Sequence, residues 1–142
     1  MANSEWSERL GSLDIKSYRD LRVWQEAMVV AAECYVLTKG FPREEAYGMT
    51  AQVRRAAASI AANIAEEHGR ETKGSFVQFL RMSQGQLKEL ETHLLLAGRV
   101  GISEPSSVET ILDRCEALGK MLRRLIRSLQ NKPFRSEERP GL

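Results

Sequence analysis

Four long segments of this chain repeat apolar residues at steps of three and four, and this spacing restricts its fold more than any other feature. Such steps place side chains on one face of an α-helix. The last segment has the most regular repeat, which consists of Val108, Ile111, Cys115, Leu118, Leu122, Leu125 and Leu129. No segment alternates in the way that strands do. We therefore predict helices over residues 17–39, 42–68, 73–100 and 104–130.

Glycine, proline and hydroxyl residues mark the expected helix ends. Gly40 and Gly69 are predicted to end the first two helices, because glycine takes the left-handed conformation found just past a helix end. Pro42 is expected to open the second helix, since its missing N–H is no loss there. Side-chain hydroxyls can cap the later helices, and the candidates are Thr72 or Ser75 for the third and Ser103 or Ser106 for the fourth.

Short connections between amphipathic helices favour neighbours that run in opposite directions. The sequence thus predicts an all-α, antiparallel up-down-up-down four-helix bundle over residues 17–131, with flexible tails at 1–16 and 132–142. With 142 residues, of which 42% are hydrophobic and 28% charged, the chain is long and apolar enough to bury one core. One domain is expected.

The first helix carries more apolar surface than a single packing seam needs. Two stripes run beside each other, one with Leu21, Trp24, Met28, Ala31 and Tyr35 and one with Val23, Ala27, Val30, Cys34 and Leu37. We expect the surplus to be buried in a homo-oligomer, although the sequence does not tell which stripe faces the partner. The candidate interface residues are Val23, Trp24, Val30, Tyr35 and Asn63. For Asn63 a solvated place at the edge of the apolar face remains the alternative to a polar group that fixes register or subunit pairing.

Charge is nearly balanced overall but uneven along the chain. There are 21 Lys and Arg residues against 19 Asp and Glu, a formal net charge of +2, yet no acidic residue occurs between Ala117 and Ser136. One side of the fourth helix carries the basic residues Lys120, Arg123, Arg124 and Arg127. They either complement the negative end of the helix dipole and keep the protein in solution, or form a ridge that contacts nucleic-acid phosphates.

Enzyme and metal chemistry lack a recognisable motif. A di-metal bundle needs Glu-x-x-His pairs, and Ala65 and Leu90 stand where His68 and His93 would require glutamate. Cys34 and Cys115 have no metal-binding or redox spacing and are expected to be buried, reduced thiols. We therefore predict no catalytic residue, no cofactor and no metal ligand, with a di-metal enzyme as a remote alternative. Without a secretory or membrane-spanning pattern, a cytoplasmic location is expected.

Several separate motifs resemble one known family. They are YRDLRVWQ at 18–25, LTKGFP at 37–42, EAYGM at 45–49, QVRRAA at 52–57, NIAE at 63–66, LKELET at 87–92 and LGKML at 118–122. This pattern is similar to the four-helix-bundle proteins encoded in intervening sequences of bacterial 23S ribosomal RNA genes, over about residues 17–130. Two positions depart from it, since Glu67 stands where glycine is expected and Gln86 where serine is expected.

The resemblance implies a cyclic homo-oligomer, in particular a pentamer, without assigned catalytic residues. Related bundle proteins assist a reverse transcriptase and bind nucleic acid in diversity-generating retroelements. We therefore expect a non-catalytic oligomeric scaffold that binds RNA or DNA through its basic face. The alternative is an accessory or assembly factor that binds a partner protein, such as a reverse transcriptase, without touching nucleic acid.

Overall fold

The computed structural model describes residues 17–68 and 72–131. These residues form four α-helices, and no strand occurs among them: α2 (Arg22–Thr38), α3 (Met49–His68), α4 (Lys73–Arg99) and α5 (Pro105–Gln130). Two short 3-10 turns, η1 (Tyr18–Asp20) and η2 (Arg43–Glu45), precede α2 and α3. The all-α prediction is confirmed, and the arrangement is consistent with a four-helix bundle. The predicted tails lie outside the described residues.

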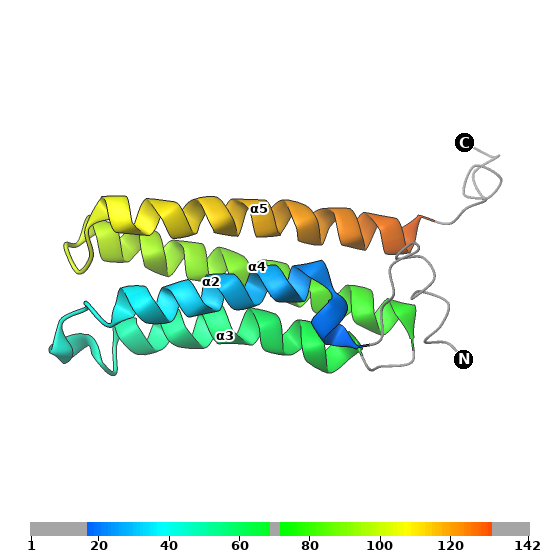
Figure 1. Ribbon diagram of the computed structural model, residues 1–142, viewed down its shortest axis with the longest axis horizontal. Helices are drawn as coiled ribbons and strands as arrows, with labels where there is room; N and C mark the ends of the chain where they lie inside the picture. Colours follow the sequence, from blue (N-terminus) through cyan, green and yellow to red (C-terminus); the bar gives the residue numbers. More distant parts are fainter. Residues whose placement is uncertain (1–16, 69–71, 132–142) are drawn as a thin grey trace.

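The helices lie side by side along a common long axis (Figure 1). The sequence colours run along α2 in one direction, return along α3, and continue to alternate through α4 and α5. Each helix packs against two others, α2 against α3 and α5, and α4 against α3 and α5. The core therefore lies between all four helices, and one side of each helix remains outside it.

The buried face of α5 follows its predicted seam closely. In α5 the buried apolar residues are Val108, Ile111, Cys115, Leu118, Leu122, Ile126 and Leu129. Leu125, which was predicted to belong to this seam, is only partly buried, and Ile126 takes its place. An α-helix has 3.6 residues per turn, so that a strict seven-residue repeat drifts away from the core over several turns. The exchange at the end of α5 corrects for this drift.

The first two helices begin later than predicted. The chain first makes η1, whose preceding residue Ser17 accepts a hydrogen bond from the Arg19 N–H while the Asp20 carboxylate accepts one from the Ser17 N–H. Leu21 is then extended (φ −78°, ψ 128°), which separates η1 from α2. These local caps compete with a continuous helix over residues 17–21.

The predicted start of the second helix at Pro42 is also wrong. Pro42 precedes η2, and α3 begins only at Met49, whose N–H donates to the Glu45 carboxylate over 2.9 Å. Gly40 is not left-handed, because Gly101 (φ 83°) is the only described residue with positive φ. The chain instead turns through backbone hydrogen bonds from Gly40 N–H to Leu37 and from Phe41 N–H to Thr38. Gly69 lies outside the described residues.

Two capping alternatives are resolved for the later helices. Thr72 caps α4, since its hydroxyl accepts a hydrogen bond from the Ser75 N–H. Neither serine proposed for α5 caps it: Glu104 occupies the cap position and Pro105 opens the helix. Proline has no N–H to satisfy in the first turn and its φ suits a helix, so that Pro105 sets the start in place of a hydroxyl.

Candidate functional site

The four basic residues that were predicted to contact nucleic acid lie together on the outer face of α5. We call Lys120, Arg123, Arg124 and Arg127 the basic ridge. All four are exposed, whereas the residues on the opposite side of the helix, such as Leu118 and Leu122, are buried. The ridge therefore occupies the surface of α5 that points away from the core, because helical residues three or four apart share one face.

None of the four ridge side chains forms an ion pair with another described residue. Arg114, six residues before Lys120 on a neighbouring face, behaves differently, because its Nε lies 2.9 Å from Glu33 Oε2 of α2. The charge of Arg114 is thus balanced within the bundle. The charge of the ridge is available to a partner.

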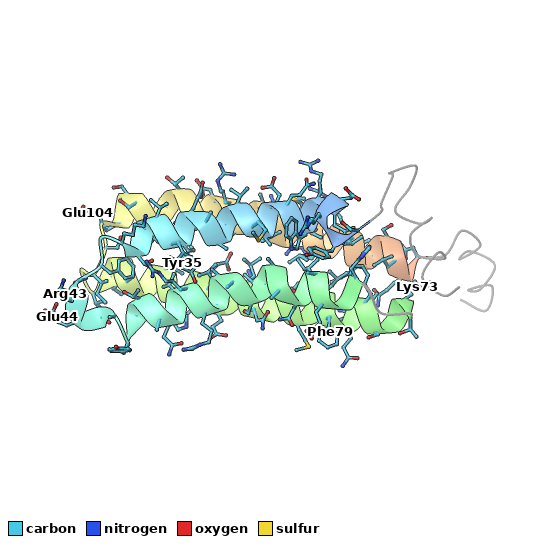
Figure 2. All side chains as sticks on the ribbon, turned by 60° about the horizontal axis from the view of Figure 1, so that its bottom comes forward. Tyr35, Arg43, Glu44, Lys73, Phe79 and Glu104 are labelled. Atoms are coloured by element: carbon cyan, nitrogen blue, oxygen red, sulfur yellow. The ribbon has the colours of Figure 1, made fainter. Side chains whose placement is uncertain are left out.

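A groove between α4 and α5 is lined by two further cationic residues that the sequence interpretation missed. The groove has a volume of about 680 Å³ and lies between the first turns of α4 and the end of α5; its lining is Lys73, Gly74, Val77, Gln78, Arg81, Leu129, Gln130 and Asn131. Figure 2 labels Lys73 at this end of the bundle. Lys73 and Arg81 belong to α4, and the packing of α4 on α5 places them in one groove with the last residues of α5.

A second, apolar groove of about 410 Å³ runs between α2 and α3. Its lining combines aromatic residues with a row of alanines: Tyr18, Trp24, Met28, Ala31, Ala32, Tyr35, Ala58, Ala61, Ala62 and Ala65. The Tyr18 and Trp24 rings meet edge to face at 5.2 Å, and Met28 and Tyr35 keep 45% and 43% of their surface exposed. Small side chains here permit close approach by another helix. We call this surface the α2–α3 groove.

The structure divides the predicted interface residues. Trp24 and Tyr35 line the α2–α3 groove. Val23 and Val30, in contrast, are buried in the core of the chain itself, with 4% and 1% of their surface exposed. Their assignment to an interface is therefore revised, since they present almost no surface to a second copy. The second apolar stripe of α2 packs within the chain. The first stripe lines the groove with Trp24, Met28, Ala31 and Tyr35, whereas its Leu21 is buried in the core.

Asn63 lies away from the groove and bonds within the chain. Its Nδ2 donates to Gln86 Oε1 of α4 over 2.7 Å, and both side chains are partly buried. Gln86 is one of the two positions that depart from the expected family pattern. The bond links α3 to α4 of the same chain. Of the roles considered for Asn63, it therefore supports a contact that fixes the register of two helices within one chain.

Tyr35 is held in place at its end of the groove by Arg54 of α3. The Arg54 guanidinium carbon lies 4.5 Å from the centre of the Tyr35 ring, and Arg54 Nε donates to the buried Thr38 hydroxyl over 2.7 Å. Thr38 in turn donates to the Cys34 carbonyl. This network joins α2 to α3 and orders the aromatic rim of the groove.

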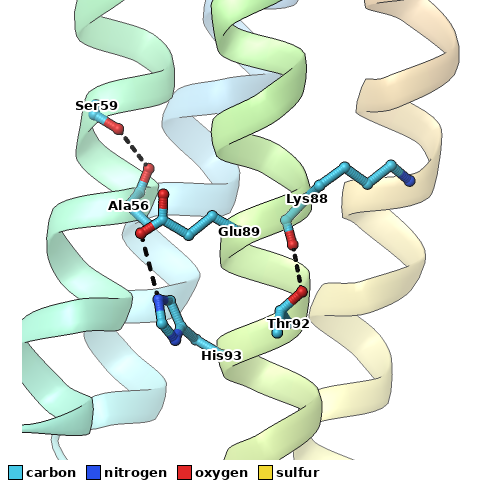
Figure 3. A network of polar contacts seen from close by, with 6 residues as sticks. All are labelled: Ala56, Ser59, Lys88, Glu89, Thr92 and His93. Atoms are coloured by element: carbon cyan, nitrogen blue, oxygen red, sulfur yellow. Dashed lines mark hydrogen bonds and ion pairs between the residues drawn. The ribbon is translucent and has the colours of Figure 1, made fainter.

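The described residues contain no group of three potential metal ligands. Glu89 and His93 approach to 3.5 Å, but both belong to α4 (Figure 3). Cys34 and Cys115 are buried and free, and burial raises the pKa of each thiol to about 12. A thiol with so high a pKa is a poor nucleophile. The expected burial of both cysteines is confirmed, and neither forms a disulfide.

Comparison with protein families matches residues 19–124 to the family described as 23S rRNA-intervening sequence protein. The match spans most of the chain, from η1 into the ridge on α5. The protein belongs to this family. No curated protein matches the sequence. Among the described residues, no helix of this family member is long and apolar enough to cross a membrane.

Proposed function

We propose that this protein is a non-catalytic, oligomeric scaffold that binds the phosphate backbone of RNA or DNA through the basic ridge. The observation that carries the proposal is the set of four exposed cations on one face of α5 that pair with no described carboxylate. Arg114 of the same helix, in contrast, is neutralised by Glu33. Unpaired cations on one face are what phosphate contact requires.

Phosphate contact is favoured over reading of base sequence. Arginine and lysine bind phosphate oxygens, and such contacts release counterions, so that affinity falls steeply with salt. The ridge has no described aromatic side chain for base stacking. Phe134, which stands nearest in sequence, lies outside the described residues. Binding should therefore depend strongly on salt and weakly on sequence.

Oligomerisation would multiply these contacts. We propose that antiparallel bundles assemble into a ring, in particular a pentamer, with the α2–α3 groove at the subunit interface. An exposed groove with aromatic and alanine residues supports this assignment, because contiguous apolar surface commonly marks an interface. Each added subunit repeats the ridge, and contacts that are weak singly then sum to a much higher affinity.

Titration of structured RNA and duplex DNA tests the ridge. We expect the wild type to bind at about 50 mM salt and to lose affinity by at least tenfold at about 200 mM. Changing Arg123, Arg124 and Arg127 to glutamate should abolish binding. The matched control changes Lys39, Arg43 and Arg55, exposed cations distant from the ridge, to glutamate. Equal binding by the ridge variant and wild type would refute the proposal.

Light scattering of the purified protein tests the assembly. A mass that corresponds to several chains is expected at micromolar concentration, and a monomeric mass would refute the ring. Elemental analysis of the same sample tests the non-catalytic assignment. One equivalent of iron, manganese or zinc per chain would favour the di-metal alternative.

A protein-binding accessory role is the second candidate, and the α2–α3 groove favours it. The same apolar surface could receive a helix of another protein, for example a reverse transcriptase. The two candidates differ in the residues they need. If nucleic acid fails to bind while the groove variant Ala62→Glu, described below, loses a partner protein, the accessory role replaces the ridge proposal.

A further inference from the structure

Three residues of the basic ridge, Lys120, Arg123 and Arg127, belong to a longer charged stripe on α5. Charged residues follow one another at steps of four and three along its outer face: Glu109, Asp113, Glu116, Lys120, Arg123 and Arg127. All six are exposed. The stripe covers about 27 Å at 1.5 Å per residue. Its first half is entirely acidic and its second half entirely basic.

Neither half of the stripe is balanced inside the chain. Glu116 and Lys120 are four residues apart, a spacing at which they could pair, yet no ion pair joins any of the six to a described residue. The helix dipole does not account for the pattern either. Its influence falls off within the first and last turns, whereas Glu116 and Lys120 are more than two turns from both ends of α5 (Pro105–Gln130).

The charges of the stripe are complementary to those of a second α5 that runs in the opposite direction. Positions 116 and 120, 113 and 123, and 109 and 127 are each equally distant from position 118. If a second α5 lies antiparallel across this face, each acidic residue meets a basic residue of the other copy. A two-fold axis at the level of position 118 makes every contact occur twice, as in any isologous interface.

We propose that the outer face of α5 binds α5 of a second copy of this chain in this antiparallel register. The partner is chosen by charge complementarity over the whole stripe. A nucleic acid would use the four cations but would be repelled by the three carboxylates that continue the same stripe. A second copy uses both halves. Ala117, beside the centre of the stripe, is small and exposed and lets the helices approach there.

The contact must be weak and sensitive to salt. Exposed ion pairs contribute little individually, and two proteins regain translational and rotational freedom when they separate. Three different ion pairs, each formed twice, therefore support only a weak and reversible association between two single bundles. Assemblies that present several α5 helices can strengthen it by multivalency.

This pairing would also compete with nucleic acid, because both cover the basic ridge. That consequence rests on the proposed function, whereas the pairing itself does not. A change of Arg124 can distinguish nucleic-acid binding from α5 pairing, since Arg124 belongs to the ridge but not to the stripe. Changing Arg124 to glutamate should weaken nucleic-acid binding more than pairing. Changing Glu109, Asp113 and Glu116 to lysine should remove pairing and leave nucleic-acid binding unchanged or stronger.

A charge exchange on one pair tests the register. Glu116→Lys and Lys120→Glu each place like charges opposite each other twice across the two-fold axis. The double variant restores opposite charges and has the formal charge of the wild type. Sedimentation velocity at about 20 mM salt should show that each single change weakens self-association about tenfold and that the double change restores it. If the double variant is as weak as the singles, the proposed register is wrong.

A mixing experiment tests the surface as a whole. The basic variant changes Glu109, Asp113 and Glu116 to lysine, and the acidic variant changes Lys120, Arg123 and Arg127 to glutamate. Neither should associate through α5 alone, but their mixture should, and more tightly than the wild type. The control is a variant with Glu44, Glu66 and Glu104 changed to lysine, which carries the same formal charge as the basic variant away from the stripe.

Figure 2 labels Glu44 and Glu104 near the end of the bundle opposite Lys73, away from the basic half of α5. Preferential binding of the acidic variant to the basic variant supports the proposal. Equal binding to the control would show only attraction between oppositely charged proteins, and it would refute the pairing. Absence of any salt-dependent association of the wild type would refute it as well, whatever the ridge does with nucleic acid.

Discussion

The α2–α3 side of the bundle and the outer face of α5 differ in what they leave at the surface. The first exposes parts of Met28 and Tyr35 above a floor of alanines, whereas the second exposes charged side chains. On their inner faces, however, α2 and α5 both contribute apolar residues to the core. These include Val23 and Val30 from α2 and Leu118 and Leu122 from α5.

The comparison shows that the core and the two surfaces are specified by different residues of the same helices. The repeat at steps of three and four fixes which side of a helix is buried. It does not determine the opposite side, where α3 has small residues and α5 has charges. An apolar surface of small residues suits close packing of another helix. A charged surface admits only a partner with complementary charge.

The largest effect is expected on the free energy of unfolding, from a substitution on the buried face of α5 compared with one on its outer face. Leu122 is fully buried, so that Leu122→Ala removes apolar contacts and leaves a cavity; we expect a loss of about 2–5 kcal/mol in the free energy of unfolding. Its neighbour on the outer face provides the control, since Arg124→Ala should change the value by less than about 0.5 kcal/mol. Urea denaturation of both variants measures the difference. Similar losses would contradict the described orientation of α5.

The next effect concerns the α2–α3 groove. Ala62 lines the groove and is exposed in the single chain, so that Ala62→Glu should leave the fold intact. In an interface it would bury an unpaired charge, which we expect to weaken assembly at least tenfold, or about 1.4 kcal/mol. Light scattering measures the mass. Ala46→Glu, at an exposed turn outside the groove, is the control. Equal masses for both variants would exclude the groove as the interface.

A smaller loss of stability is expected from removing the hydrogen bond between α3 and α4. Asn63→Ala removes the 2.7 Å hydrogen bond to Gln86 and should lower the free energy of unfolding by about 0.5–1.5 kcal/mol. Gln86→Ala and the double variant complete a cycle that isolates the bond. Light scattering sharpens the comparison, because the mass should not change if Asn63 acts only within its chain. A lower mass would return Asn63 to the subunit interface.

Sequence periodicity predicted the fold class and nearly all of the core, because burial of one helical face leaves a regular signal. It failed where local hydrogen bonds compete with helix formation. Glu45 caps Met49 and delays α3, and Pro105 replaces the predicted serine caps of α5. Such choices depend on backbone angles that residue type alone does not determine.

The candidate site was predictable only where it belongs to one helix. The basic ridge could be identified because Lys120 and Arg127 share a face of a single helix. The groove that Lys73 and Arg81 line could not be predicted, since it is formed by the packing of α4 on α5. For α2, two stripes were visible, but only the neighbouring helices decide that Val23 is buried and that Trp24 borders the groove.

The smallest expected effect is a pH dependence at the end of α3, beyond the alanine floor of the groove. The His68 ring lies edge to face with Phe76, 6.0 Å between centres. Burial lowers the pKa of His68, and the Asp20 carboxylate of η1 partly opposes this shift. The folded chain therefore favours the neutral imidazole more than the unfolded chain does, whose pKa is about 6.5.

The sign of the effect follows from this difference. The stabilising contribution of neutral His68 is present above about pH 6.5 and is lost as the pH falls through the lower pKa of the folded state. Urea unfolding between about pH 5 and 8 should thus show a decrease towards acid that is smaller in His68→Gln. Asp20→Asn removes the opposing charge and should make the decrease larger. The α5 stripe contains no histidine, so reversal of its charges should leave the His68 contribution unchanged. If His68→Gln has the same pH profile as the wild type, another group causes the decrease and the assigned burial of His68 has no energetic consequence.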